Sequence, residues 1–463
     1  MARVDELQEK YANIPREIII KWELLRGGIR ESAVLDRVSD WLRPTGQYQS
    51  RDIDVTMTEI ARKRPDTVRP GYIMRPRDLY MKNGISVQTR RDSGSAYEVM
   101  DLGSGGFGIF EGEEKVEDVY FPAATVPWAE EPLTGKGSPV TSLVKLNRVC
   151  FKIGAMRYCE YFARGEQCKF CNFNATQDDA RASGADVPIY IDLDETVEAY
   201  EIIGSQVRLL EGFFQMGGLK SREQEMKLQL SFLEKIASAI PYKPFLSMGT
   251  QPMSRKDLQR LKNAGLDSTT LNLEVWDPRL YDEILPGKAK WIGRERVLAA
   301  LLDAVDILGA GNVGTSLVGS VTLMPANGHK TWQEARDSHI EGNRWLIKHG
   351  VFPHFHAIRL GVGSIYGDDR ANRARLAPIE YYLDLALAHH EAMMEYDLYA
   401  KYNRKFMRCP LDGIASIYGG ELGILAQAGD VGSYAAQLGV PEETNWLARF
   451  VSPLNARPTA PMG

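Results

Sequence analysis

Three cysteines fall within thirteen residues of this 463-residue chain, and Cys159, Cys168 and Cys171 form a C-x8-C-x2-C spacing. Three thiolates on one loop can hold three corners of a [4Fe–4S] cluster and leave the fourth iron open. An open iron can bind and activate a small molecule, whereas a fully ligated cluster mainly transfers electrons. Zinc is the alternative, but an ordinary zinc site needs a fourth Cys or His at short spacing, and the nearest downstream histidine is His329. The triad therefore favours an iron–sulfur site.

The composition is that of an ordinary globular protein, with 44% hydrophobic and 25% charged residues and a net charge of −5. We expect no nucleic-acid partner, because both signs of charge are mixed and no broad basic surface is indicated. We expect no membrane contact, because no apolar run reaches the roughly 18–20 residues of a membrane helix. The charged N-terminus lacks the apolar region of a secretory signal, and five cysteines do not suggest a disulfide framework. These features predict a cytoplasmic protein.

Residues 1–140 predict an N-terminal extension that caps the rest of the chain. Up to residue 65 the pattern is helical: Ile18, Ile19, Trp22, Leu25 and Ile29 make one apolar stripe, and residues 34–42 make a second. Between residues 66 and 125, short alternating segments punctuated by Gly, Pro and Asp predict a small β-meander or hairpin.

Residues 141–370 predict a core of six strand-then-helix units. The expected strands are 148–153, 212–216, 244–248, 269–274, 313–323 and 354–360, and the expected helices between them are 194–203, 222–239, 255–264, 294–308 and 331–348. This α/β alternation predicts a parallel sheet curled into a full or partial TIM-like (β/α) barrel. Residues 371–463, with a helix at 379–396 and an irregular tail, would complete or cover it. The triad follows the first strand, at the end of the barrel where such enzymes place their active sites.

In this setting the triad resembles that of the radical S-adenosylmethionine (SAM) superfamily. The common family motif is C-x3-C-x2-C; here the first gap is eight residues, but Cys-Lys-Phe-Cys is kept. The resemblance implies a [4Fe–4S] cluster held by Cys159, Cys168 and Cys171, with SAM bound to the open iron. It also implies that Phe170 packs near the SAM adenine.

Later segments resemble the family in the same order. Met216-Gly-Gly resembles its glycine-rich turn, where backbone carbonyls accept hydrogen bonds from the SAM ammonium, so Gly217 and Gly218 are implied contacts. The alternative is an ordinary turn at a strand end. Asn272 and Glu274 end the fourth strand, where the family uses a polar or acidic residue on the SAM amino group or ribose. An acid at a strand end is otherwise often solvated.

Two further segments add candidate SAM contacts. Arg294 and Arg296 open the next helix, where a family arginine often pairs with the SAM carboxylate; either could equally be a surface charge. The strand ending at Gly319 resembles the segment that lies against the adenine. The stretch from Asp257 to residue 290 resembles the biotin-synthase-like branch in particular, and the resemblance covers roughly residues 145–370.

By this resemblance the protein is a radical SAM enzyme, which cleaves SAM reductively to a 5′-deoxyadenosyl radical that abstracts hydrogen from a substrate. It implies an electron donor such as flavodoxin or ferredoxin. A small-molecule substrate is our expectation, since a basic surface for RNA is lacking. Methyl transfer, carbon–carbon bond formation or cleavage, and rearrangement remain open. The alternative function is a non-catalytic Fe–S or zinc module for electron transfer or scaffolding.

Three histidine and cysteine features leave their roles open. His354 and His356 lie on the last strand and face one side of it. If that side is the barrel interior, they could bind substrate or transfer a proton; structural packing is the alternative. Cys409 could donate a hydrogen atom or accept a covalent bond in the active site, or be an inert buried thiol. His389 and His390, on the C-terminal helix, are expected on a solvated face.

The run from Gly103 to Gly108 is a literal G-x-G-x-x-G. A dinucleotide fingerprint must open a helix, so that the pyrophosphate meets the helix N-terminus. The residues that follow alternate as in a strand. We therefore expect a hairpin loop there, against the alternative of a nucleotide-binding oxidoreductase.

Overall fold

The computed structural model describes residues 2–30, 32–35, 48–50, 74–76, 78–88, 92, 94–103, 106–121, 128, 131–147, 150–182, 188–209, 211–361, 363–402, 415–416, 429 and 433. The chain divides into two compact units. One comprises residues 1–131 and 410–463, and the other residues 132–409. No helix among the described residues is long and apolar enough to cross a membrane.

The first unit combines helices with small antiparallel sheets. Its elements are α1 (Arg3–Lys10), α2 (Arg16–Gly27), β1 (Tyr48–Ser50), β2 (Met74–Pro76), β3 (Asp78–Tyr80), β4 (Ser86–Gln88), β5 (Tyr97–Gly103), β6 (Gly106–Glu111), β7 (Glu114–Val119) and β15 (Ala415–Ser416). The first apolar stripe of the sequence is the buried face of α2. The second stripe lies largely outside the described residues.

The predicted meander is confirmed, because β5, β6 and β7 pair antiparallel in that order. Gly103 pairs with Gly106 across the first turn, and Gly108 lies within β6. The glycine run therefore belongs to a β-hairpin, and no helix follows it. This geometry lacks the helix N-terminus on which a dinucleotide pyrophosphate would rest.

The second unit is built on six parallel strands in sequential order. They are β9 (Cys150–Met156), β10 (Glu211–Met216), β11 (Phe245–Thr250), β12 (Ser268–Leu271), β13 (Val313–Gly319) and β14 (Val351–Ala357). Each pairs parallel with the next, and the short β8 (Lys145–Asn147) pairs antiparallel with β9. Because every crossover leads to the neighbouring strand, the helices gather on one side and the sheet curls. Among the described strands β8 and β14 do not pair with each other, so this is a partial barrel.

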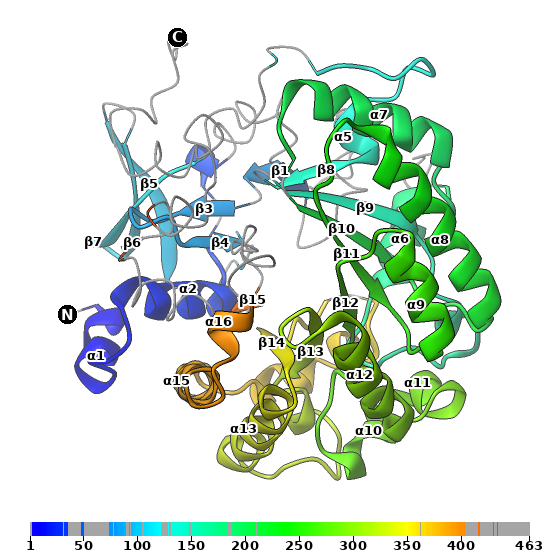
Figure 1. Cartoon of the computed structure of the whole chain (residues 1–463). Coiled ribbons are helices and arrows are strands. Elements are labelled where there is room, and N and C mark those ends of the chain that lie inside the picture. The colour runs from blue at the N-terminus through cyan, green and yellow to red at the C-terminus, as the bar shows by residue number, and fades with distance from the viewer. Residues whose placement is uncertain are drawn as a thin grey trace. The chain divides into compact units, whose positions relative to one another are not determined.

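The helices of this unit lie along the convex side of the sheet (Figure 1). The longer ones are α6 (Phe173–Ala182), α7 (Leu193–Gln206), α8 (Arg222–Ala239), α9 (Arg255–Asn263), α12 (Arg294–Leu308), α13 (Trp332–Lys348) and α15 (Ile379–Glu395). Shorter ones are α5 (Val140–Leu143), α10 (Pro278–Ile284), α11 (Pro286–Trp291), α14 (Ile365–Asp368), α16 (Leu398–Tyr402) and the 3-10 turns η2 (Glu160–Arg164), η3 (Val321–Leu323) and η4 (Arg370–Arg375). Side-chain caps begin several of the long helices; the Ser221 hydroxyl, for example, accepts from the Gln224 N–H.

The predicted α/β barrel core is confirmed, and three strands end earlier than expected. The sixth ends at Ala357 instead of residue 360. The fourth strand stops at Leu271, and Glu274 follows with a left-handed φ of 68°. The fifth stops at Gly319, because Ser320 also has a positive φ, 60°, and starts a 3-10 turn. L-residues rarely adopt this region, and it breaks the extended backbone that a strand needs.

The expectation of a solvated face for His389 and His390 is wrong for His389. This residue is fully buried, and its Nε2 lies 2.9 Å from the Pro353 carbonyl oxygen of β14. The apolar face of α15 packs towards the sheet, and His389 falls on that face. His390 is half-buried, with Nδ1 2.9 Å from the Tyr399 hydroxyl.

An aromatic cluster holds the first strands against the helix layer. Phe151 of β9 is fully buried; its ring centroid lies 4.7 Å from that of Tyr200 in α7 and 6.2 Å from that of Phe214 in β10. A Cβ on Gly212 of β10 would lie 2.1 Å from the Phe151 ring. Only glycine at position 212 therefore leaves space for this ring.

Phe151→Ala is expected to lower the free energy of unfolding by about 3–5 kcal/mol, because it removes a buried ring and leaves a cavity. Chemical denaturation measures the change. Leu302→Ala, on the exposed side of α12 at 36% exposure, is the matched control and should change stability far less. Equal losses in the two variants would show that the cluster does not anchor β9.

Candidate functional site

The three cysteines lie on the loop that leaves β9 and enters α6. Cys159 follows the strand, η2 occupies residues 160–164, and Gly165 ends that turn in the left-handed region with φ 67°. Cys168 and Cys171 belong to the following turn, in which the Cys171 N–H donates to the Cys168 carbonyl at 2.9 Å. The long first gap of the motif is therefore an inserted 3-10 turn, and the loop stands at the carboxyl end of the first barrel strand.

The three thiols are near enough to influence one another. Burial raises the pKa of all three, to about 12 for Cys171, and neighbouring thiols raise the pKa values of Cys168 and Cys171 further. Backbone N–H groups of Tyr161 and Gly218 donate to the Cys159 sulfur, and that of Phe173 donates to the Cys171 sulfur. Such bonds favour the thiolate, which is the form that binds metal.

The donor set fits an iron–sulfur cluster. No group of three or more Cys, His, Asp and Glu side chains in the described parts of the chain is placed to hold one metal ion. A cluster differs from a single ion, because each thiolate binds a different iron and hydrogen bonds to the sulfurs tune the site. Three thiols from one loop, with backbone donors aimed at two of the sulfurs, meet these requirements.

The backbone of Cys159 is held by an asparagine that sequence reasoning missed. The Asn174 side-chain oxygen accepts from the Cys159 N–H at 2.8 Å, and its amide donates to the Cys159 carbonyl at 2.9 Å. Asn174 is 3% exposed and lies in the first turn of α6. Its position three residues after Cys171 is the signal that could have identified it, since Asn commonly bonds backbone groups near helix starts.

The glycine pair after β10 packs directly on the cysteine loop. A Cβ on Gly217 would lie 1.9 Å from the Tyr158 carbonyl oxygen, which no side chain could tolerate. The Gly218 carbonyl accepts from the Glu160 N–H at 3.0 Å, and the Gly218 N–H serves the Cys159 sulfur. In this structure these glycines are required by the approach of two protein backbones.

Glu274 is paired with a lysine, Lys288 of α11. The Lys288 Nζ lies 2.9 Å from the Glu274 carboxylate and donates to the Asn272 carbonyl at 3.0 Å. Side-chain exposure is only 14% for Lys288 and 11% for Glu274. Burial alone would lower the pKa of Lys288, but the charges of Glu274 and Cys168 outweigh it and raise that pKa, so the ammonium stays charged.

The backbone of Glu274 is strained and braced. Its φ of 68° costs on the order of 1–3 kcal/mol in a non-glycine residue. The cost is offset by two bonds to β13: the Glu274 N–H donates to the Ser316 carbonyl at 2.7 Å, and the Val318 N–H donates to the Glu274 carbonyl at 2.9 Å. This conformation presents the carboxylate to Lys288. Lys288 could not be identified as the partner of Glu274 from sequence, since its place beside Glu274 depends on the position of α11.

The other predicted SAM contacts are more dispersed. Phe170 lies between Cys168 and Cys171 and is half-buried, and Asn272 is exposed directly after β12. Gly319 ends β13, where a Cβ would lie 2.8 Å from the Tyr382 ring of α15. That glycine is required by helix packing.

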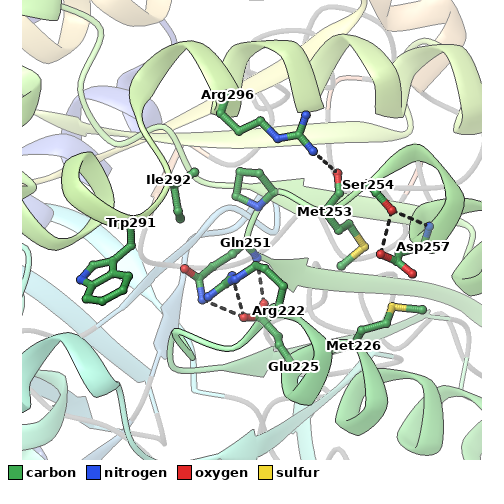
Figure 2. Close-up of a pocket in the computed structure, with 11 residues that line it drawn as sticks. Arg222, Glu225, Met226, Gln251, Met253, Ser254, Asp257, Trp291, Ile292 and Arg296 are labelled. Carbon is green, nitrogen blue, oxygen red and sulfur yellow. Dashed lines mark hydrogen bonds and ion pairs between the residues drawn. The ribbon is translucent and has the colours of Figure 1, made fainter.

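The two arginines have protein partners of their own. The Arg294 guanidinium donates to the Trp276 carbonyl at 2.9 and 3.1 Å and lies 5.0 Å from the centroid of the Trp276 ring. Arg296 lines a pocket of about 280 Å³ beside the ends of β10 and β11 (Figure 2). These contacts do not bring either arginine to the thiols.

The two strand histidines face the concave side of the sheet. Phe355, between them, lies with its ring centroid 5.7 Å from that of His339 in α13, so it faces the helices, and alternation directs His354 and His356 the other way. The Nδ1 of His356 is 3.2 Å from the Ser316 hydroxyl of β13. Cys409 lies outside the described residues.

By sequence, the chain matches no known protein family and no curated protein. Solved structures with partial similarity include the FeFe-hydrogenase maturase HydG from Carboxydothermus hydrogenoformans, at 16% identity and a TM-score of 0.38 over 53% of this chain and 51% of that one. Another HydG structure has 14% identity and a TM-score of 0.39, over 53% and 50%. Methylornithine synthase (PylB) has 15% identity and a TM-score of 0.37, over 65% and 84%. This chain thus spans about half the length of HydG.

Gly217→Ala is expected to displace the loop around Cys159, because the added methyl would overlap the Tyr158 carbonyl. Iron and sulfide retained after anaerobic reconstitution should fall several-fold, and the melting temperature should drop. Gly154→Ala on β9 is the matched control, since its Cβ would meet nothing within 4 Å. Normal iron retention in Gly217→Ala would contradict the close packing of these two backbones.

Lys288→Met should destabilise the apo-protein by about 3–5 kcal/mol, because it leaves the Glu274 carboxylate buried without its cation. The double variant Lys288→Met/Glu274→Gln removes both charges and should recover most of that loss. Urea denaturation of Lys288→Met, of Glu274→Gln and of the double variant gives the double-mutant cycle. Losses that simply add would show that the two side chains are not coupled.

Proposed function

We propose that this protein is a radical SAM enzyme of the biotin-synthase-like kind acting on a small-molecule substrate. The observation that supports this most strongly is the half-buried triad of Cys159, Cys168 and Cys171 at the carboxyl end of the first strand of a partial (β/α) barrel. Catalytic residues of barrel enzymes come from this end of the strands. A loop of three thiols there leaves one corner of a [4Fe–4S] cluster for a ligand.

Cluster and SAM, when bound, would supply a 5′-deoxyadenosyl radical able to take hydrogen from an unactivated carbon. The residues of the chain have the tasks of binding and positioning. Cys159, Cys168 and Cys171 would ligate iron, with Asn174 holding the backbone of the first thiol. Lys288 adds a buried positive charge beside the thiols, which offsets the negative charge that three thiolates bring.

Glu274 is the best-placed acidic group for the SAM amino group or ribose. It is 9% exposed and follows β12, and its carboxylate is near enough to raise the pKa values of Cys168 and Cys171. It is already bonded to Lys288, so one carboxylate would serve the lysine and the ligand together. Phe170, within the same loop, would lie against the adenine.

His354 and His356 are proposed to contact the substrate on the concave side of the sheet. Ser316 holds one ring nitrogen of His356, which fixes the orientation of that ring. A neutral imidazole oriented in this way can accept or donate a single proton. A flavodoxin or ferredoxin is the proposed source of electrons.

The deciding experiment is anaerobic reconstitution with iron and sulfide, reduction with dithionite and addition of SAM, with 5′-deoxyadenosine as the measured product. The wild type should form it, and Cys168→Ala should form none, because one corner of the cluster is lost. Cys150→Ser, outside the triad, is the control and should retain product formation. A colourless protein that binds zinc and forms no 5′-deoxyadenosine would favour a non-catalytic module instead.

A further inference from the structure

An exposed tryptophan lies on the surface beside the cysteine loop. Trp291 ends α11 and is 44% exposed, and its indole N–H donates to the Glu166 carboxylate at 2.8 Å. The ammonium groups of Lys220 and Lys290 lie 5.1 and 5.4 Å from the centroid of its ring. We refer to Glu166, Lys220, Lys290 and Trp291 as the Trp291 patch. An aromatic ring between two cations is suited to contact with a protein partner.

The patch is structurally continuous with the loop that carries the thiols. Gly287 is the second residue of α11; its N–H donates to the Glu166 carbonyl at 2.9 Å, and a Cβ there would lie 2.8 Å from the Tyr161 ring. Within this one short helix, Lys288 is close enough to Cys168 to lower the pKa of its thiol, and Trp291 is exposed three residues later. A protein bound to Trp291 would therefore lie beside Glu166, which is two residues before Cys168 in the cysteine loop.

The surface around the patch is positive, although the whole chain has a net charge of −5. Glu166 is shared by Lys290 and Lys220, at 2.6 and 3.6 Å. In the neighbouring pocket Glu225 is paired with Arg222 at 2.9 Å, and Asp257 with Arg260 at 3.3 Å. The Glu160 carboxylate accepts from the Lys220 backbone N–H at 2.6 Å. The remaining four cations, Arg164, Lys220, Lys290 and Arg296, therefore stand against two carboxylates, Glu160 and Glu166, which is a local excess of two positive charges.

The pocket extends the same surface. Trp291 and Ile292 line it, and Arg296 and Arg222 lie on opposite sides of it (Figure 2). Lys290 is 58% exposed at its side chain and its partner Glu166 only 14%, so the more accessible charge of this ion pair is positive. A partner with carboxylates around its own redox centre would complement this surface in charge.

We propose that the Trp291 patch and the adjacent pocket rim form the docking surface for an acidic one-electron carrier protein. This proposal rests on the proposed function, which needs an external electron. In the transfer, one electron leaves the reduced carrier and enters the cluster held by the cysteine loop; no bond is formed or broken. The carrier is oxidised by one electron and the cluster is reduced by one.

The test uses the full-length, reconstituted protein and an acidic flavodoxin as the probe. Titration calorimetry gives the dissociation constant, and stopped-flow absorbance gives the rate of cluster reduction by the flavodoxin hydroquinone. For Lys220→Glu/Lys290→Glu we expect a dissociation constant weakened on the order of tenfold or more and a shallower dependence on salt. Reduction by dithionite, a small molecule, should be unchanged.

Lys235→Glu/Lys243→Glu is the matched control, because it makes the same change in charge at two lysines that are each 49% exposed and ion-paired elsewhere on this unit. It should leave flavodoxin binding unchanged. Trp291→Ala, which keeps all charges, should also weaken binding and provides a second variant if the charge reversal perturbs the loop.

The outcomes separate the two proposals. If dithionite and SAM give 5′-deoxyadenosine but the patch variants bind and accept electrons like the wild type, the docking surface is wrong while the proposed function stands. If binding by the wild type does not weaken with salt, the charge argument is wrong. If no 5′-deoxyadenosine forms in the wild type, the proposed function fails and the docking proposal fails with it.

Discussion

The backbone of Cys159 is the point on which the candidate site depends. Its N–H and carbonyl are both bonded to the Asn174 side chain, and its sulfur accepts from two backbone N–H groups. A buried backbone group without a partner is costly, so this loop adopts the conformation that satisfies each of its groups. Gly217 lies against the same segment from β10. The first strand, the second strand and α6 thus converge on one residue, and they set where the first thiol points.

Electrostatics impose the second requirement. These half-buried, neighbouring thiols resist ionisation, because desolvation raises the pKa of all three and nearby thiols raise those of Cys168 and Cys171 further. Lys288 supplies a compensating charge from a helix that is distant in sequence, and Glu274 keeps that lysine charged. The ion pair therefore connects the end of the fourth strand with the loop after the first. Two elements on opposite sides of β10 and β11 in the sheet are coupled through it.

Much of the fold could be predicted from sequence because its pattern is local. Alternating buried strands and amphipathic helices give the barrel core, and α8 and α12 begin and end at the predicted residues. What could not be predicted depends on tertiary packing. The positive φ of Glu274 is imposed by bonds to β13, and the burial of Lys288 and His389 follows from where α11 and α15 pack. Contacts with other chain segments also explain why positions 217 and 319 are glycine, which the sequence alone could not predict.

The open form of the barrel has a consequence for what it can enclose. In a closed barrel, strand number and shear together determine the diameter. Among the described strands β8 and β14 do not pair with each other, so no hydrogen-bonded ring of described strands sets the width of the concave face. Its curvature depends instead on how α13 and α15 pack behind β13 and β14, for example through Gly319 and Tyr382. A side chain in place of Gly319 at that seam would therefore change the curvature of the concave face without altering the thiol loop after β9.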